Sequence, residues 1–233
     1  MTGVQYIPVI TIDGPSGTGK GTISRLLAQK LGFHFLDSGA IYRLLGLAAN
    51  NRSMNMENEA GLVSLAQKLN IHFSSDAGET RIFLDDLDVT DTIRTEEIGR
   101  YASMVAVFPD VRAALLERQR AYRRPPGLVA DGRDMGTVVF PDAQVKVFLT
   151  ASQEERARRR YKQLSGKGID VTLQHLLQEL AARDGRDSQR RVAPLVAAAD
   201  AKVIDTSALT IDEVFAEVVR LCKKFGDGRQ ASP

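Results

Sequence analysis

The sequence predicts an α/β fold in which helices flank a parallel sheet, and two observations support this. Short runs of β-branched residues alternate with amphipathic helical segments along most of the 233 residues. Because parallel strands need crossover connections, such alternation is typical of a parallel sheet covered by helices on both faces. The second observation is one exception, residues 71–89, which read as two or three short strands without an intervening helix. This segment predicts a small antiparallel β insert.

The first predicted strand, residues 9–12, leads directly into a glycine-rich turn. The helix after that turn has apolar residues at helical spacing, and Gly32 is expected to end it. Residues 33–36 predict the second strand, and the next helix has an apolar stripe of its own. The two stripes consist of Ile23, Leu26, Leu27 and Leu31, and of Ile41, Leu44, Leu45 and Ala48.

The antiparallel insert is expected to turn at residues 76–79, after a helix that carries Leu62, Leu65 and Leu69. Three further strands are predicted at residues 128–130, 145–149 and 202–204. Helices are expected to follow two of these strands, because capping boxes come next at Ser152 with Glu155 and at Thr210 with Glu213. The Gly- and Lys-containing segment 163–171 links two helices and is a candidate lid.

Composition excludes several classes of protein. The formal net charge is only +2, so any basic patch is local and favours a small anionic ligand over a nucleic acid. A single cysteine, Cys222, excludes an internal disulfide and a Cys-rich zinc site. No apolar run approaches the roughly 20 residues of a membrane span, and the N-terminus lacks the features of a signal peptide. We therefore expect a cytoplasmic protein without membrane partners.

The glycine-rich turn predicts a site for the phosphates of a nucleoside triphosphate. It reads Gly14-Pro15-Ser16-Gly17-Thr18-Gly19-Lys20-Gly21-Thr22. Its glycines allow successive N–H groups to point at phosphate oxygens, and the helix dipole and Lys20 add positive charge. Gly21 stands where Ser or Thr would bind Mg²⁺, so Thr22 is the candidate metal ligand instead. The ending Gly-Lys-Gly-Thr resembles nucleoside monophosphate kinases more than GTPases, and no Asn-Lys-x-Asp guanine motif is present.

A second group of residues predicts a site for the phosphate acceptor. Asp37 ends the second strand, and Ser38 and Arg43 follow it, although they could simply be a helix cap and a surface arginine. The run Asp131-Gly132-Arg133-Asp134-Met135-Gly136 follows the strand at residues 128–130. Ligands of such sheets gather at the carboxyl ends of strands, where Asp131 could act on Mg²⁺ through water or merely cap a turn.

Two arginine-rich segments complete the candidate site. Arg183, Arg186 and Arg190 are three and four residues apart, which places them on one face of a helix, with Asp184 and Asp187 able to orient them. Gly185 within that run predicts a bend or a close approach. Before the candidate lid come Arg156, Arg158, Arg159 and Arg160, and one or two of them are expected to close over the phosphates. The alternative for both segments is a solvated charged face.

These motifs together resemble the bacterial cytidylate kinases, and the resemblance runs from Ile10 to about Thr206. It rests on the runs at residues 12–17, 36–43, 131–142 and 183–184. The resemblance implies a P-loop kinase of three parts: a core, a monophosphate-binding insert at about residues 50–98 and a helical lid at about 156–172. It also implies ATP-dependent phosphorylation of CMP and dCMP and a Mg²⁺ requirement. Separately, we expect the protein to be a monomer.

Matching motifs assign roles by resemblance. Lys20, Arg133, Arg183, Asp131 and Arg158 would be catalytic, and Thr22 and Asp131 would serve the metal, the latter through water. Around the acceptor, the resemblance places Asp37, Ser38, Arg43, Ser103, Arg112, Arg133, Asp134, Arg183, Asp187 and Arg190. Cytosine presents an N4 donor, which suits the Asp134 carboxylate, whereas uracil presents an acceptor there.

Two alternatives stay open from the residues alone. The chain could be another small-acceptor kinase that acts on UMP, AMP or shikimate, against which Asp134 and its arginines argue. It could instead be a non-catalytic nucleotide- or RNA-binding module that uses the arginine-rich helices. The near-neutral net charge and the intact Lys20 count against that second alternative.

Overall fold

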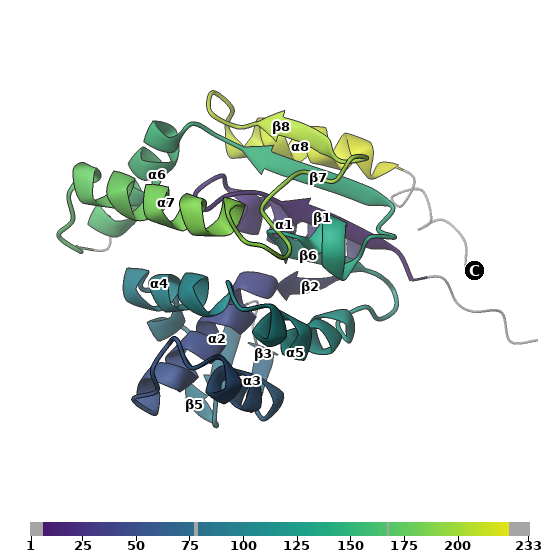
Figure 1. Cartoon of the computed structure of the whole chain (residues 1–233). Coiled ribbons are helices and arrows are strands. Elements are labelled where there is room, and N and C mark those ends of the chain that lie inside the picture. Colours follow the sequence, from purple (N-terminus) through teal and green to yellow (C-terminus); the bar gives the residue numbers. More distant parts are fainter. Residues whose placement is uncertain (1–6, 77–78, 167, 224–233) are drawn as a thin grey trace, which may run out of the picture. The chain divides into compact units, whose positions relative to one another are not determined.

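The computed structural model describes residues 7–76, 79–166 and 168–223. The chain divides into two compact units (Figure 1). Unit 1 combines Met1–Asp37 with Arg120–Pro233, and unit 2 is Ser38–Gln119. None of the helices described is long and apolar enough to cross a membrane.

Unit 1 is built on a five-stranded sheet in the order β2-β6-β1-β7-β8, in which every neighbouring pair is parallel. Its strands are β1 (Val9–Asp13), β2 (His34–Asp37), β6 (Leu128–Gly132), β7 (Val145–Thr150) and β8 (Lys202–Asp205). All five predicted strands are confirmed, with ends that differ by a residue or two. The parallel register brings Asp13, Asp37 and Asp131 to the same end of neighbouring strands.

The α-helices described in unit 1 form two pairs, one packed in the apolar core of the sheet and one packed together around its own apolar cluster. They are α1 (Lys20–Leu31), α6 (Gln153–Ser165), α7 (Leu173–Ser188) and α8 (Ile211–Leu221), and a π-helical turn spans Met135–Val139. α8 contacts α1, and both contribute to the core through Ile23, Leu27, Val214 and Val218. The predicted stripe of α1 is partly wrong, because Leu26 is 36% exposed and the buried face continues through Ser24 and Ala28 instead.

The ends of these helices follow the capping prediction in part. Gly32 is left-handed at the C-terminus of α1, as predicted. Thr210 and Glu213 form a complete capping box at α8. At α6, Ser152 accepts a hydrogen bond from the Glu155 N–H, but the Glu155 carboxylate pairs with arginines and does not complete the box. The neighbouring charges on α6 therefore outcompete the cap for that carboxylate.

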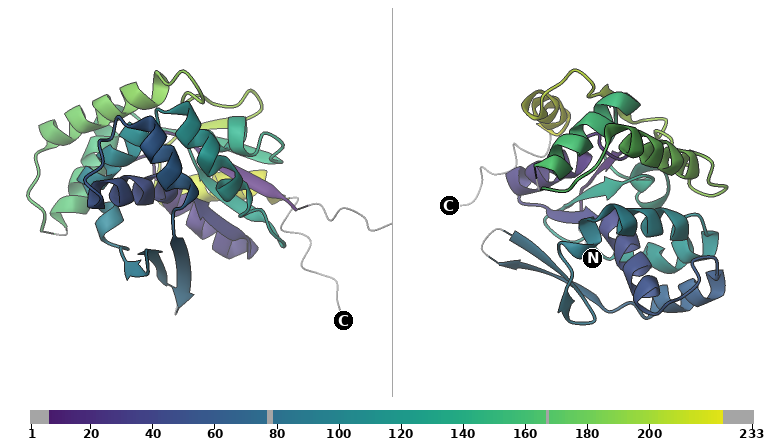
Figure 2. Two further views of the ribbon diagram at one scale, coloured as in Figure 1. Left: turned by 60° about the horizontal axis from the view of Figure 1, so that its bottom comes forward. Right: turned by 90° about the vertical axis from the view of Figure 1, so that its left-hand side faces the viewer.

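Unit 2 consists of helices and a small antiparallel sheet. The helices are α2 (Ser38–Asn51), α3 (Glu59–Gln67), α4 (Glu96–Val105) and α5 (Pro109–Arg120), with a 3-10 turn at Thr92–Arg94. The sheet has the order β3-β4-β5 (Ile71–Asp76, Glu79–Leu84 and Leu87–Asp88), which confirms the antiparallel insert. Residues 77–78 of the predicted turn lie outside the described residues. Figure 2 shows the β3-β4 hairpin projecting from the helices of this unit.

α2 holds unit 2 together because it is apolar on nearly every side. Its predicted stripe of Ile41, Leu44, Leu45 and Ala48 is fully buried. α4 packs closely against α2, as a Cβ at Gly46 would lie only 2.9 Å from the Cβ of Tyr101. Leu69 was predicted within the preceding helix but lies beyond the end of α3, where it is still buried.

Candidate active site

The glycine-rich loop runs from the end of β1 to the start of α1, as the sequence predicts. Gly14 has a φ of 146°, and a Cβ at this position would lie 2.1 Å from the carbonyl oxygen of Leu149 on β7. Only glycine therefore lets the loop leave β1 in this direction. Gly19 is the N-cap of α1 and has no side chain to cap it, so N–H groups of the first turn are open to an anionic ligand.

Lys20 lies at the start of α1 and is directed across the loop. Its Nζ donates to the carbonyl oxygen of Pro15 at 3.3 Å and lies 4.0 Å from Oδ1 of Asp131. Burial, and then the positive charge of Arg133, lower the pKa of Lys20, while Asp131 opposes this shift. Burial likewise raises the pKa of Asp131, and Lys20 opposes that shift. The two side chains therefore stabilise one another as a buried ion pair with little exposure to solvent.

Asp131 has the properties of a ligand for a hydrated cation. Its Oδ1 is buried and has no hydrogen-bond partner among the described residues. A Cβ at Gly21 would lie 3.1 Å from its Oδ2, so the absence of a side chain there leaves the carboxylate accessible from the loop. Thr22 is exposed in the first turn of α1. Within the described ranges, no group of three or more His, Cys, Asp and Glu could hold a metal, so substrate oxygens and water would have to supply the remaining ligands.

Asp13 is a site residue that sequence reasoning missed. The carboxylate accepts hydrogen bonds from the backbone N–H groups of Met135 at 2.9 Å and Gly136 at 2.8 Å. It thus connects the end of β1 to the π-helical turn that follows Asp134. Burial raises the pKa of Asp13 to about 7, although both N–H donors favour the charged form. An aspartate that ends a fully buried strand was the signal that could have drawn attention to it.

Three of the predicted acceptor residues form one charged group. Arg133 Nε donates to Asp187 Oδ2 at 2.9 Å, and Arg190 Nη2 donates to Asp187 Oδ1. Burial alone would raise the pKa of Asp187, but the charges of Arg133 and Arg190 outweigh it and hold that pKa well below its usual value. Asp134 is also buried in this unit, with only 3% of its surface exposed.

Two predictions for the arginine run at residues 183–190 are wrong. Arg190 does not share a helical face with Arg183 and Arg186, because α7 ends at Ser188 and Arg190 reaches back to Asp187 from beyond it. Gly185 makes no close approach, since a Cβ there would meet none of the described atoms within 4 Å. α7 continues through Gly185 without interruption.

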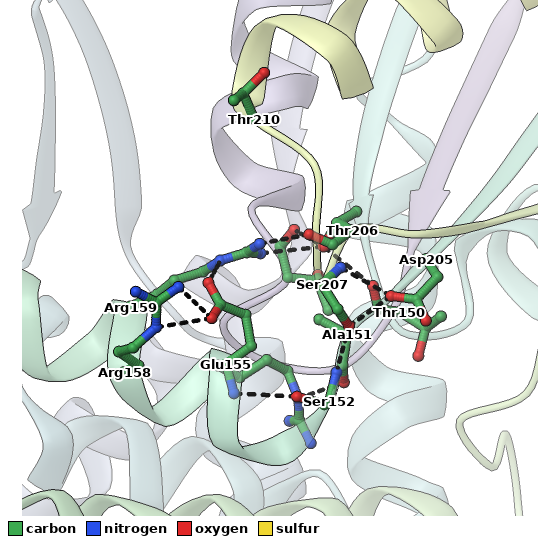
Figure 3. Close-up of polar contacts among 12 residues, drawn as sticks. Thr150, Ala151, Ser152, Glu155, Arg158, Arg159, Asp205, Thr206, Ser207 and Thr210 are labelled. Atoms are coloured by element: carbon green, nitrogen blue, oxygen red, sulfur yellow. Dashed lines mark hydrogen bonds and ion pairs between the residues drawn. The ribbon is translucent and has the colours of Figure 1, made fainter.

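The four arginines of α6 differ sharply in their surroundings. Arg156 is buried, whereas the Arg158 side chain is 73% exposed and among the described residues binds Glu155 alone, at 2.8 and 2.5 Å. Figure 3 shows Glu155 between Arg158 and Arg159. Arg159 continues to Thr206, donating to its hydroxyl at 3.1 Å and to its carbonyl at 2.5 Å. Arg158 can therefore move to a ligand with the smallest loss of protein contacts among these arginines.

Four further acceptor residues belong to unit 2, whereas Asp37 and Arg183 belong to unit 1. Arg43 donates to the carbonyl oxygens of Ile93 at 2.6 Å and Thr95 at 3.1 Å. Arg112 is buried with its guanidinium 5.4 Å from the ring centroid of Tyr42. Ser103 is buried on α4.

Ser38 was expected to be either a substrate contact or a helix cap, and the structure gives its hydroxyl a side-chain partner. It is the first residue of α2 and donates to Gln119 Oε1 at 2.7 Å. Gln119 is 2% exposed and was missed, because a glutamine within a helix gives no sequence signal for such a role. The roles of these unit 2 residues toward a substrate stay predictions.

Comparisons with known proteins identify the family of this chain. The family model described as cytidylate kinase matches residues 10–224. The cytidylate kinase of Aeromonas salmonicida is 60% identical over 224 residues, which cover 96% of this chain and 97% of that protein. That of Methylococcus capsulatus is 61% identical over 208 residues, covering 89% and 93% respectively. Because the family model and these relatives match most of this chain, the chain belongs to the cytidylate kinase family.

Proposed function

We propose that this chain transfers the γ-phosphoryl group of ATP to CMP and dCMP, which gives ADP with CDP or dCDP. The observation that carries the proposal is the glycine-rich loop with Lys20 held 4.0 Å from Asp131, in a chain of the cytidylate kinase family. This loop would bind the phosphates of the donor. The buried Asp134 and the group formed by Arg133, Asp187 and Arg190 provide for an anionic, cytosine-bearing acceptor.

The reaction needs no covalent enzyme intermediate. A phosphate oxygen of CMP attacks the γ-phosphorus in line, and the bond from that phosphorus to the β–γ bridging oxygen breaks as ADP leaves. Lys20 would stabilise the charge that spreads over the β- and γ-phosphate oxygens, and Arg183 and Arg158 would add positive charge around the transferred group. Holding both phosphates in register supplies roughly 7–11 kcal/mol of the barrier in well-oriented reactions.

Asp131 and Thr22 fit a Mg²⁺ ion, Asp131 through a water molecule. The buried Asp131 oxygen without a hydrogen-bond partner supports this assignment, as does the space in front of it at Gly21. When bound, the ion supplies positive charge next to the transferred phosphoryl group. Lys20 would supply positive charge from the protein itself at the loop, in addition to that of the ion.

The acceptor assignment follows from hydrogen-bond chemistry. A carboxylate accepts from the N4 amine of cytosine, whereas uracil would place its O4 acceptor against that carboxylate. We assign the acceptor to Asp37, Arg133, Asp134, Arg183, Asp187 and Arg190 of unit 1 and to Ser38, Arg43, Ser103 and Arg112 of unit 2. We further propose a cytoplasmic monomer that binds no nucleic acid, with an insert at about residues 50–98 and a lid at about 156–172.

A panel of acceptors tests the proposed function. ADP formation is measured with MgATP and, separately, CMP, dCMP, UMP, AMP and shikimate. The proposal expects CMP and dCMP to be phosphorylated with the highest kcat/KM. A higher kcat/KM for UMP or AMP would overturn the base assignment, and ADP formation independent of any acceptor would overturn the kinase assignment.

A further inference from the structure

Arg156 is buried, unlike the other arginines of α6, and every nitrogen of its guanidinium has a protein partner. Its Nε donates to the carbonyl oxygen of Ala151 at 3.2 Å. Nη1 donates to the carbonyl oxygen of Ser16 and to Asp184 Oδ1, both at 3.2 Å. Nη2 donates to Asp184 Oδ2 at 2.6 Å. Only 6% of the side chain is exposed and four of its five N–H donors are used, so little is left for binding a phosphate.

These partners lie on three segments of unit 1, and α6 and α7 also pack together through an apolar cluster. Ser16 belongs to the phosphate-binding loop, Ala151 precedes α6, and Asp184 lies on α7. The loop also packs directly on Arg156, since a Cβ at Gly17 would lie 2.9 Å from the Cβ of Arg156. The guanidinium therefore fixes the position of α7 relative to the loop.

That position matters because α7 carries residues assigned to the transferred and accepting phosphates. Arg183 immediately precedes Asp184, and Asp187 lies one turn further along and binds Arg133. α7 is thus held at two successive turns, by Arg156 near the donor loop and by Arg133 after β6. Loss of the first connection would leave Arg183 free to shift relative to the loop.

We infer that Arg156 is a positioning residue for phosphoryl transfer, which acts through Ser16 and Asp184 and does not touch the substrates. The inference rests on the proposed function, because the reaction it concerns is the transfer from ATP to CMP. A bidentate guanidinium is needed for this role: a lysine ammonium is a single point and cannot hold both the Ser16 carbonyl and the two Asp184 oxygens.

The test is a double-mutant cycle with Arg156→Lys, Asp184→Asn and the double variant. We expect each single substitution to lower kcat about 10- to 100-fold, the range that misplacement of a reacting group costs. Because the two residues act as one unit, the double variant should be no slower than the slower single variant. The Kd of a non-hydrolysable ATP analogue should change less than about threefold, since no phosphate contact is removed.

Asp142→Asn is the matched control, because it removes another short carboxylate contact to an arginine. Arg123 Nη1 donates to Asp142 Oδ2 at 2.6 Å, and this pair lies outside the assigned site. The control should keep the kcat of the wild type. Melting temperatures of all variants are measured alongside, and Asp184→Asn alone carries the test if Arg156→Lys does not fold.

Three results would overturn the inference. The effects on kcat could multiply in the double variant, the analogue could bind more weakly in proportion to kcat, or only the melting temperature could change. A wild-type chain that binds the analogue but does not phosphorylate CMP is a different result, because it contradicts the proposed function itself.

Discussion

The carboxylate of Asp13 accepts a hydrogen bond from the backbone N–H of Gly136 at 2.8 Å. Its second oxygen accepts from the N–H of Met135 at 2.9 Å. Asp13 directly precedes the phosphate-binding loop, and these two N–H groups follow Asp134. One buried side chain therefore connects the donor half of the site to the residue assigned to the acceptor base.

Asp13→Asn should destabilise the protein by about 1–3 kcal/mol at pH 8, since the amide nitrogen replaces one acceptor and leaves a buried N–H without a partner. The effect should be larger at lower pH. The pKa of Asp13 is raised to about 7, so its carboxyl disfavours ionisation in the folded state. The Asp13 carboxyl therefore contributes its full share to wild-type stability below about pH 4. This contribution falls as the pH rises toward 7, by about 4 kcal/mol at most.

Urea denaturation at several pH values measures this difference. The unfolding free energy of the wild type should exceed that of Asp13→Asn, and this difference should become smaller as the pH rises from 5 to 8. A gap that stays constant, or widens as pH rises, would show that Asp13 ionises normally in the folded protein.

Lys20→Ala should lower kcat about 100- to 1000-fold while the protein remains folded, because a positioned cation at the transferred phosphates is lost. Steady-state kinetics and circular dichroism measure the two effects. Lys30→Ala, on the exposed side of the same helix, is the control and should keep the wild-type kcat. Unchanged turnover in Lys20→Ala would contradict the assignment of the loop.

Asp187→Asn should remove an acid-sensitive contribution to stability. The pKa of Asp187 lies well below its usual 3.8, so the ionised carboxylate stabilises the folded state above that value. This contribution is lost as pH falls below about 4. At pH 7 the variant should be destabilised by about 3–5 kcal/mol, because Arg133 and Arg190 would lose a buried partner.

Thermal unfolding from pH 7 to pH 3 checks this expectation. The difference in stability between wild type and Asp187→Asn should shrink below about pH 4. A difference independent of pH in that range would mean that the variant is destabilised by altered packing and not by loss of charge.

Asp134→Asn should relax the choice of base. The amide can donate to the O4 of uracil, whereas the carboxylate cannot, so the ratio of kcat/KM for CMP over UMP should fall. One good hydrogen-bonding pair gives about 1–3 kcal/mol of discrimination, which corresponds to a fall of about 5- to 150-fold. The ratio is measured with both acceptors competing in one reaction. An unchanged ratio would show that Asp134 does not read the base.

Strands and the phosphate-binding loop could be predicted from sequence because local patterns determine them. The buried β-branched run at residues 145–149 corresponds to β7, Val145–Thr150, within one residue. The loop is equally local, since its glycines, its lysine and the following helix are contiguous.

Long-range partners could not be predicted. Asp13 binds N–H groups 122 and 123 positions away, and no local pattern specifies that pairing. Arg156 resembles its neighbours Arg158 and Arg159 in the sequence, and only the structure shows its burial and its contacts with the phosphate-binding loop and Asp184. The spacing of Arg186 and Arg190 suggested one helical face, but spacing cannot show that α7 ends before Arg190.

Transfer of a labelled phosphoryl group tests the central claim most directly. Wild-type protein is incubated with MgATP labelled at the γ-phosphate and equal amounts of CMP, UMP and AMP, and the products are separated. We expect the label in CDP, with far less in UDP or in ADP formed from AMP and none bound to the protein. Label found mainly in UDP, in inorganic phosphate or on the protein would contradict the claim.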